Sequence, residues 1–447
     1  MENKKWFTFV LCLVLLLFLN TNLWAVFSTG LPEDPNWYVD EEISKIVPVW
    51  NKGLLKCAPP KGGYNKLVDN QKIISSWGYK ARPMEEIKDL LPEPIYNIYT
   101  NPRWGTVRVN ETSWEAAKPR GVIWEKFIAQ SKRNTTEVYL DEKNWLRNYK
   151  YGIPFYDLDE KDPKIAVKII WNFLKRIQDN DRYCTMVAAY QDRRGRARMT
   201  SFVNKRLHCS NRNRDDIHTK DGLYVNNPKN YDFIYVVPFL SPYNLRGTIP
   251  VYFRYNDSDK DDDFWIYIPS IRRIRRMSVA QHQDRMPGGA DWTWDSTEGF
   301  EGNVQRFNWT YLGRKELLTP VLAHSHAYLN PTGFICGMDQ YYQRRNCYVI
   351  KASYKRPINM TEMILYIDPL LFSSCYSIDR DLKGRDWIIQ FISQGRDKNW
   401  FYNMYNDWAF DILTTHISAV QFAYCGGKGM VIDEFRMDEL KKEYLSR

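Results

Sequence analysis

The chain has 447 residues, a formal net charge of +10 and 15% aromatic residues. Hydrophobic residues make up 44% of the sequence, which is typical of a folded protein and excludes a disordered or fibrous chain. The basic balance favours an anionic partner, such as lipid head groups, an acidic ligand or nucleic acid.

Residues 1–25 have the pattern of a secretory signal. Lys4 and Lys5 give a basic start, and the run from Trp6 to Leu19 is apolar apart from Thr8. As a helix this run reaches only about 21 Å, which is short of the ~30 Å hydrocarbon core of a membrane. We therefore expect cleavage near residue 25 and a soluble periplasmic product.

The alternative to cleavage is an uncleaved membrane anchor, because Leu23 stands where a small residue is usual before the cut. No cysteine follows the apolar run directly, so we expect no lipid anchor. Export also makes nucleic acid the least favoured of the anionic partners, and we expect none.

Residues 26–147 are rich in Pro, Trp and Lys, and their weak periodicity predicts an N-terminal segment that wraps around the rest. Short helices are expected at 83–91 and 121–131. The first strong element begins at Asp162 and Pro163, because Asp caps helices and Pro suits the first turn. Apolar residues then recur at helical spacing, which predicts a helix that buries one face. They are Ala166, Ile169, Ile170, Phe173, Leu174 and Ile177.

From Arg182 onward, short aromatic and β-branched runs alternate with turn-rich clusters, a pattern typical of antiparallel sheet. Ten such runs predict a large sheet that curls or closes and so creates a concave apolar face. A charged helix is expected at 433–446. The predicted strands span residues 183–190, 198–207, 233–239, 248–255, 264–268, 271–277, 304–312, 347–354, 361–367 and 387–393.

Seven cysteines remain after removal of the signal, and in an oxidising compartment we expect them to pair with one left over. Cys336 and Cys347 flank a short polar loop and form the preferred pair, although the spacing leaves the connectivity open. Neither CxxC nor close Cys/His spacing occurs, so we expect no metal and no cofactor. The seven are Cys57, Cys184, Cys209, Cys336, Cys347, Cys375 and Cys425.

The most distinctive passage, residues 247–276, contains two aromatic strands joined by an acidic turn and followed by an arginine-rich strand. Its four arginines put two charges on each strand face and could hold a phosphate or carboxylate. The alternative is that they pair with the acidic turn or discourage pairing at a sheet edge. Aromatic residues nearby either pack in the core or line a ligand cavity. The candidate ligand-binding residues are Phe253, Tyr255, Trp265, Tyr267, Arg272, Arg273, Arg275, Arg276 and Trp309.

Three other patterns resemble known sites only superficially. The aspartates of residues 257–263 lack the glycine and distal glutamate of an EF-hand loop, which indicates a solvated hairpin tip. His324 and His326 have no evident third metal ligand, and the glycines around Lys428 lack phosphate-loop spacing. Neither G-x-S-x-G nor H-E-x-x-H occurs, so we expect no catalytic residues and no enzyme.

Several landmarks between about Asn148 and Asp368 occur together. They include Tyr151-Gly-Ile-Pro-Phe155, Ser241-Pro-Tyr-Asn-Leu-Arg-Gly247 and Asp259-Lys-Asp-Asp-Asp-Phe-Trp-Ile-Tyr-Ile-Pro269. With these motifs the chain closely resembles the exported bacterial family labelled domain of unknown function 1329, whose fold is similar to that of the lipoprotein carriers LolA and LolB. The resemblance implies a half-open antiparallel barrel with covering helices over residues 148–447. It also implies a carrier of an amphipathic molecule, associated with inner-membrane transporters and outer-membrane proteins.

We therefore expect a mainly β (α+β) protein with a large curled antiparallel sheet that forms a half-open LolA/LolB-like barrel. The leading hypothesis is a non-enzymatic periplasmic carrier or binding protein for a lipid or other hydrophobic anion. Aromatic residues would hold the tail, and Arg272 to Arg276 would lie near the head. The alternatives are an adaptor that docks a transporter or outer-membrane complex, and an enzyme acting on an envelope lipid.

Overall fold

The computed structural model describes residues 72–73, 82–101, 107–111, 119–257, 259–323, 328–329, 335–336, 338–396, 402–426 and 429–445. The predicted signal, the two histidines at 324 and 326, and Lys428 lie outside the described residues. Within this part of the chain, no helix has the length and apolar character needed to cross a membrane.

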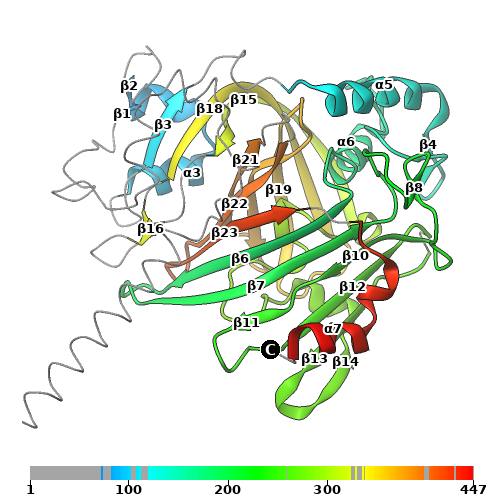
Figure 1. Ribbon diagram of the computed structural model, residues 1–447. Coiled ribbons are helices and arrows are strands. Elements are labelled where there is room, and N and C mark those ends of the chain that lie inside the picture. The colour runs from blue at the N-terminus through cyan, green and yellow to red at the C-terminus, as the bar shows by residue number, and fades with distance from the viewer. Residues whose placement is uncertain are drawn as a thin grey trace, which may run out of the picture.

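Fifteen strands of the described residues form one large curved sheet (Figure 1). All pairs are antiparallel except β3 with β18. The strands are β3 (Val107–Glu111), β6 (Asp181–Gln191), β7 (Ala197–His208), β10 (Tyr231–Val236), β11 (Phe239–Ser241), β12 (Ile249–Tyr255), β13 (Asp263–Ile268), β14 (Arg273–Arg276), β15 (Phe307–Ala323), β18 (Met338–Tyr354), β19 (Met360–Ile367), β20 (Ser374–Asp381), β21 (Asp386–Arg396), β22 (Tyr402–Asp411) and β23 (His416–Gly426).

The sheet consists of two meanders. The spatial order is β14-β13-β12-β10-β7-β6-β23-β22-β21-β20-β19-β18-β15, with β11 on β7 and β3 on β18. Pairing of β6 with β23 joins the first meander to the second. Within the described residues, the edge strands β14 and β15 do not pair with each other, so the sheet stays open. The expected mainly β, half-open barrel is therefore confirmed.

All ten predicted strands are present, and the third is divided into β10 and β11. Strands β3, β20, β22 and β23 of the sheet were not predicted. In β20 and β22, the buried polar residues Ser377, Asp379 and Asp407 interrupt the apolar alternation that identifies a strand. These buried polar groups make the two strands resemble loops in the sequence.

Short elements complete the chain. The expected helix at 121–131 is α5 (Val122–Glu137), and the expected terminal helix is divided into η10 (Ile432–Phe435) and α7 (Met437–Leu445). The N-terminal helices are η4 (Met84–Leu90) and α3 (Glu93–Thr100), and the remaining short 3-10 turns are η6 to η9 between residues 269 and 306. Two-residue strands form the pairs β1 (Lys72–Ile73) with β2 (Arg82–Pro83), β4 (Tyr139–Leu140) with β5 (Leu146–Arg147), β8 (Thr219–Lys220) with β9 (Leu223–Tyr224), and β16 (Tyr328–Leu329) with β17 (Ile335–Cys336).

The preferred disulfide between Cys336 and Cys347 is wrong, because Cys347 is a free and fully buried thiol. It lies within β18, opposite Lys315 of β15, whereas Cys336 belongs to the separate β16–β17 pair. The polar residues between the two cysteines extend β18 and do not form a tight hairpin loop. Cys209 and Cys375 are also free and buried.

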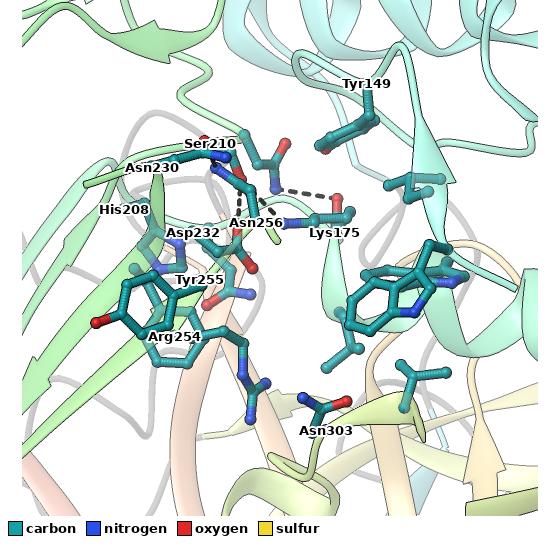
Figure 2. A pocket seen from close by; sticks show the side chains of 18 of the residues that line it. Tyr149, Lys175, His208, Ser210, Asn230, Asp232, Arg254, Tyr255, Asn256 and Asn303 are labelled. Atoms are coloured by element: carbon teal, nitrogen blue, oxygen red, sulfur yellow. Dashed lines mark hydrogen bonds and ion pairs between the residues drawn. The ribbon is translucent and has the colours of Figure 1, made fainter. Parts of the chain in front are cut away.

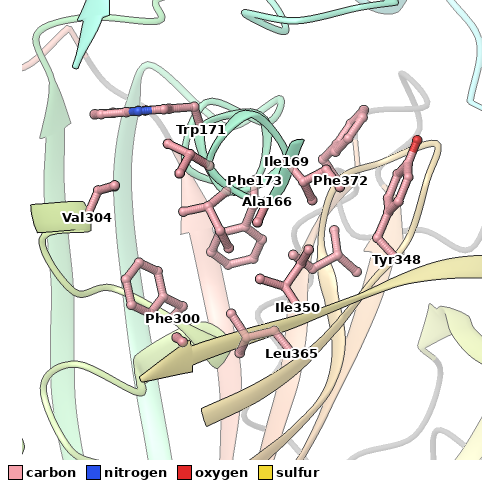
Figure 3. Packing of buried hydrophobic residues seen from close by; sticks show 14 of the residues in the cluster. Ala166, Ile169, Trp171, Phe173, Phe300, Val304, Tyr348, Ile350, Leu365 and Phe372 are labelled. Carbon is pink, nitrogen blue, oxygen red and sulfur yellow. The ribbon is translucent and has the colours of Figure 1, made fainter. Parts of the chain in front are cut away.

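The predicted strong helix is α6 (Ile165–Leu174), and it lies across the concave face of the sheet. Its apolar stripe points into the barrel, where Ile169 and Phe173 are fully buried near Ile350 and Leu365 (Figure 3). The segment between β14 and β15 occupies a further part of the concavity with Trp292 and Trp294. The protein's own side chains thus fill much of the face that sequence analysis assigned to a ligand.

Helices cover the opposite, outer face in two places. The short helices η4 and α3 pack on strands of the second meander and contribute Ile87, Ile95 and Tyr99 to that core. Helix α7 packs on the first meander through Leu440 and Tyr444. Both faces of the sheet are therefore buried along part of its length.

The buried stripe of α6 allows a modest test of this packing. We expect Ile169→Val to lower the free energy of unfolding by about 0.5–1.5 kcal/mol, because it leaves a methyl-sized void at a fully buried site. The matched control is Ile217→Val, at a side chain that is 88% exposed, where the change should stay within about 0.5 kcal/mol. Urea denaturation measures both, and equal effects would contradict the placement of α6.

Candidate functional site

A cavity of about 310 Å³ lies beside the C-terminal end of α6, between the helix and strands β7, β10 and β12 (Figure 2). Helix α6 brings Trp171 and Leu174 to it, and the residues just after the helix add Lys175 and Arg176. The segment Glu301 to Val304, which precedes β15, closes one side. The other lining residues are Trp145, Leu146, Arg147, Asn148, Tyr149, Gln178, Arg206, His208, Ser210, Asn211, Leu223, Asn230, Asp232, Phe233, Arg254, Tyr255 and Asn256.

One wall of the cavity is apolar. The indole rings of Trp145 and Trp171 lie 5.8 Å apart, and Leu146 and Leu174 extend the same wall. Trp171 is fixed because its Nε1 donates a 2.9 Å hydrogen bond to the carbonyl oxygen of Asn144. This wall could shelter a short apolar group from water.

Lys175 forms the first polar group of the opposite wall, and it is 5% exposed. Its ammonium group is paired with the Asp232 carboxylate and donates to Ser210 Oγ at 2.9 Å. Burial acts to raise the pKa of Asp232, but Lys175 and Ser210 outweigh it and hold that pKa below its ordinary value. The ammonium also lies 5.3 Å from the centre of the Tyr149 ring, as a cation–π contact.

Arg206 and Arg254 form the second polar group. Arg206 donates to the Glu301 carboxylate at 2.7 Å, and Arg254 donates to the Glu301 carbonyl oxygen at 2.6 Å. Both guanidinium groups lie over Phe233, at 4.6 and 5.0 Å from the ring centre. Arg254 is further fixed by Asp262 at 3.2 Å. Nε of Arg206 is buried without a hydrogen-bond partner.

His208 adds no positive charge to this wall. Burial lowers its pKa well below the ordinary value, and the charges of Arg206 and Arg182 lower it further, so the imidazole is neutral at pH 7. The cavity is therefore lined by five permanent cations and by only two carboxylates, those of Asp232 and Glu301. Each of these five basic side chains is ion-paired, but three of the partner carboxylates, those of Asp141, Glu298 and Asp262, lie outside the lining, so the lining itself favours an anionic ligand.

A second ion-pair group supports this wall from behind. Glu298, which is 2% exposed, receives hydrogen bonds from Arg176 at 2.8 Å and from Arg182 at 2.5 Å. Arg176 is thereby held where its side chain can line the cavity. Pairing with Glu298 compensates the two buried guanidinium groups, which would otherwise be costly to keep charged.

The nine predicted site residues do not lie together in the structure. Only Tyr255 lines the cavity. Phe253 and Tyr267 pack in the outer-face core beneath α7, and Trp265 lies against Arg276, whose guanidinium is 5.6 Å from its ring. Trp309 packs edge-on against Phe300, at 5.1 Å between ring centres. A ligand-binding role for the residues outside the cavity stays a prediction.

The predicted arginines lie at a different place from the cavity cations. Arg272, Arg273, Arg275 and Arg276 are exposed on and beside the edge strand β14. Arg276 pairs with Asp263 at 2.7 Å. This pair agrees with the alternative interpretation, in which the arginines pair with the acidic turn. Two other turn aspartates also have basic partners, since Asp259 pairs with Lys143 at 2.7 Å and Asp262 with Arg254. In the described part of the chain, no group of three or more His, Cys, Asp or Glu residues could hold a metal ion.

The cavity cations were missed by sequence reasoning. Arg206 and Arg254 sit inside strands, where a charged residue normally indicates the solvent face. The sequence pattern around Arg254 could have identified it as a buried charge. Tyr252 and Arg254 lie two residues apart, so they share a strand face, and Tyr252 is aromatic. A cation on the same face as a core aromatic residue indicates a paired, inward-pointing charge.

The geometry defines a mainly β, half-open barrel whose concave face is covered by a helix with a cation-lined cavity at its end. The chain belongs to the family described as "Protein of unknown function (DUF1329)", which matches residues 80–394. The family suggested by the sequence motifs is thus confirmed. No curated protein matches the sequence.

Three solved structures are similar to this chain. A DUF1329 family protein from Desulfovibrio piger is 14% identical, with a TM-score of 0.44 over 61% of this chain and 96% of that one. A putative outer membrane lipoprotein-sorting protein domain from Vibrio parahaemolyticus is 12% identical, with a TM-score of 0.44 over 61% and 97%. A LolA superfamily protein from Nitrosomonas europaea is 10% identical, with a TM-score of 0.37 over 59% and 93%.

Proposed function

We propose that this protein is a non-enzymatic binding protein that works outside the cytoplasm and holds a small amphipathic anion in the cavity beside α6. The observation that carries the proposal is the pairing of an apolar wall, Trp145 and Leu174, with a cationic wall, Lys175, Arg206 and Arg254. The anionic head would meet the cations, and the apolar part would lie against the indole rings. The signal-like residues 1–25 support the location.

The size of the cavity limits the ligand. A volume of about 310 Å³ is at the lower end of the range of about 300–1,000 Å³ for small-molecule sites. Helix α6 and the segment before β15 already occupy much of the concave face, so a long acyl chain would have to extend out of the cavity. We propose a ligand with a phosphate or carboxylate head and one short apolar chain.

Binding is favoured over catalysis by the state of Ser210. Its hydroxyl donates to Asp232, whose pKa lies below its ordinary value, so this carboxylate is a weak base. The neighbouring Lys175 is engaged in an ion pair with the same carboxylate. A serine nucleophile needs a partner that takes its proton readily, and neither neighbour meets that requirement.

Octyl phosphate is a suitable probe, with octylammonium and octyl glucoside as cationic and neutral comparisons. We expect octyl phosphate alone to raise the melting temperature and to bind measurably in calorimetry. Lys175→Gln should weaken binding by about 10- to 100-fold, the value of one charged hydrogen bond. The matched control is Lys229→Gln, an exposed lysine outside the cavity, which should leave binding unchanged.

A second variant covers the case in which Lys175→Gln unfolds the protein. Leu223→Trp places a larger side chain in the cavity lining and leaves every ion pair intact, so it should block octyl phosphate without loss of fold. Mass spectrometry of small molecules extracted from natively purified protein should recover anionic amphiphiles from the wild type and not from this variant. Equal binding of the three probes, or undiminished binding by the tryptophan variant, would refute the cavity as the site.

A further inference from the structure

A patch of basic and apolar side chains is exposed at one end of the barrel, away from the cavity. Its basic members are the four arginines of residues 272–276, and Arg246 lies exposed in the loop after β11. Its apolar members lie on β11 and the loop after it, on the turn before β14, on β14 and at the end of α7. They are Leu240, Tyr243, Ile271, Ile274 and Leu445, which are 36%, 93%, 44%, 43% and 39% exposed.

The loops that carry the patch lie side by side. Figure 1 shows β11, β13, β14 and α7 together at the lower end of the molecule. Gly247, with φ of +78°, is the point of closest approach, because a Cβ there would lie 2.5 Å from Cδ2 of Leu445 and 3.2 Å from Cγ of Pro269. The loop after β11, the β13–β14 turn and the C-terminal end of α7 therefore form one surface.

Arginines predominate among the charged side chains of this surface. Arg276 is paired with Asp263, whereas Arg272, Arg273 and Arg275 project from the edge of the sheet. Arginines at a sheet edge discourage pairing with a second strand, which disfavours an added peptide strand as the occupant. Their charges instead suit a surface that carries many negative groups.

The apolar side chains of the patch favour a lipid bilayer over an acidic protein as its binding partner. Single exposed apolar residues are ordinary, but here a nearly fully exposed tyrosine and two isoleucines lie on the same edge strand and neighbouring loops as the arginines, with Ile274 on the face of β14 opposite Arg273 and Arg275. Tyrosine and aliphatic side chains enter the head-group region of a bilayer, and arginines beside them pair with lipid phosphates. An acidic protein partner would use the charges and have little need of the apolar side chains.

We propose that this end of the barrel, residues 240–247 and 269–276 with Leu445, docks on the surface of an anionic lipid bilayer. Each arginine near the surface contributes electrostatic attraction, and Tyr243 and Ile271 enter the interface. The inference does not depend on the cavity, because none of its residues lines the cavity.

Co-sedimentation with vesicles tests the proposal, using phosphatidylglycerol mixed with phosphatidylcholine and phosphatidylcholine alone. The wild type should bind the anionic vesicles at least about tenfold more tightly, and binding should weaken as salt is raised. Arg273→Glu with Arg275→Glu should reduce that binding by at least about tenfold. Lys220→Glu with Lys229→Glu is the matched control, since it reverses two exposed lysines elsewhere and should reduce binding far less.

The apolar half is tested by Tyr243→Ser with Ile271→Ser, which keeps every charge. We expect this double variant to lose severalfold in vesicle binding, and the cavity variant Leu223→Trp to retain it. Binding that depends on the arginines but is unaffected by the serine variant would indicate an acidic protein as partner and refute the membrane proposal. Equal binding to both kinds of vesicle, or equal loss in the lysine control, would also refute it.

Discussion

Glu298→Gln is expected to lower the free energy of unfolding by about 3–5 kcal/mol at pH 7. The carboxylate is 2% exposed and accepts hydrogen bonds from both Arg176 and Arg182. The glutamine keeps the shape but removes the charge, so the two buried guanidinium groups lose their compensating anion. Leaving a buried charge without its partner is among the most destabilising single changes.

The same carboxylate should make the wild type sensitive to acid. Burial acts to raise the pKa of Glu298, but the nearby Arg182, Arg206 and Arg176 outweigh it and lower that pKa to about 2. Because the folded-state pKa is depressed, the stabilisation is complete above the unfolded value of about 4.3 and is lost as the pH falls towards 2. The variant has no such group and should show a smaller loss of stability over this pH range.

Urea denaturation followed by tryptophan fluorescence at pH 7 and at about pH 2.5 measures both effects. The control is Glu142→Gln, because Glu142 is exposed and its substitution should change the free energy of unfolding by less than about 0.5 kcal/mol. A variant as stable as the wild type at pH 7 would show that Glu298 does not compensate these arginines.

Local periodicity predicted most of this fold. The runs that became β6, β7, β12 and β13 alternate or cluster apolar residues in the manner of strands, and the stripe of α6 has helical spacing. These patterns depend only on neighbours in the chain, so a single sequence reveals them. The strands β20 and β22 escaped because Asp379 and Asp407 are buried where the pattern requires apolar residues.

The cavity is a product of tertiary structure and could not be predicted in the same way. Lys175 meets Asp232 across 57 residues of sequence, and Arg206 meets Glu301 across 95. A charged side chain is tolerated in the protein interior only when a residue from a distant part of the chain pairs with it. The local sequence pattern does not show which residues pair. The four arginines of residues 272–276 are conspicuous in the sequence because they are clustered, yet clustered charges on an edge strand indicate an exposed surface.

Asp379→Asn is expected to stabilise the protein at pH 8, by up to about 5 kcal/mol. Asp379 is fully buried on β20, and burial raises its pKa to about 8. Its carboxyl accepts a long, 3.4 Å hydrogen bond from Nε2 of Gln390 and interacts with Ser296, and these neutral partners do not outweigh the cost of burying its charge. An asparagine retains an acceptor at this position and cannot ionise.

The sign of the pH dependence follows from the raised pKa. Below about pH 4 the group is protonated in both the folded and unfolded states, and the stability it confers is complete. Between pH 4 and 8 only the unfolded state releases the proton, so the free energy of unfolding falls by about 1.4 kcal/mol per pH unit. Asp407, whose pKa burial also raises to about 8, adds an equal slope that remains in the single variant.

Urea denaturation at pH 5, 6, 7 and 8 therefore separates the two groups. The wild type should lose stability steeply over this range, Asp379→Asn less steeply, and the double variant with Asp407→Asn least. Asp261→Asn, at an exposed aspartate in the acidic turn, is the control and should follow the wild-type slope. Parallel slopes in the wild type and the Asp379 variant would mean that this carboxyl ionises in the folded protein as easily as in the unfolded chain.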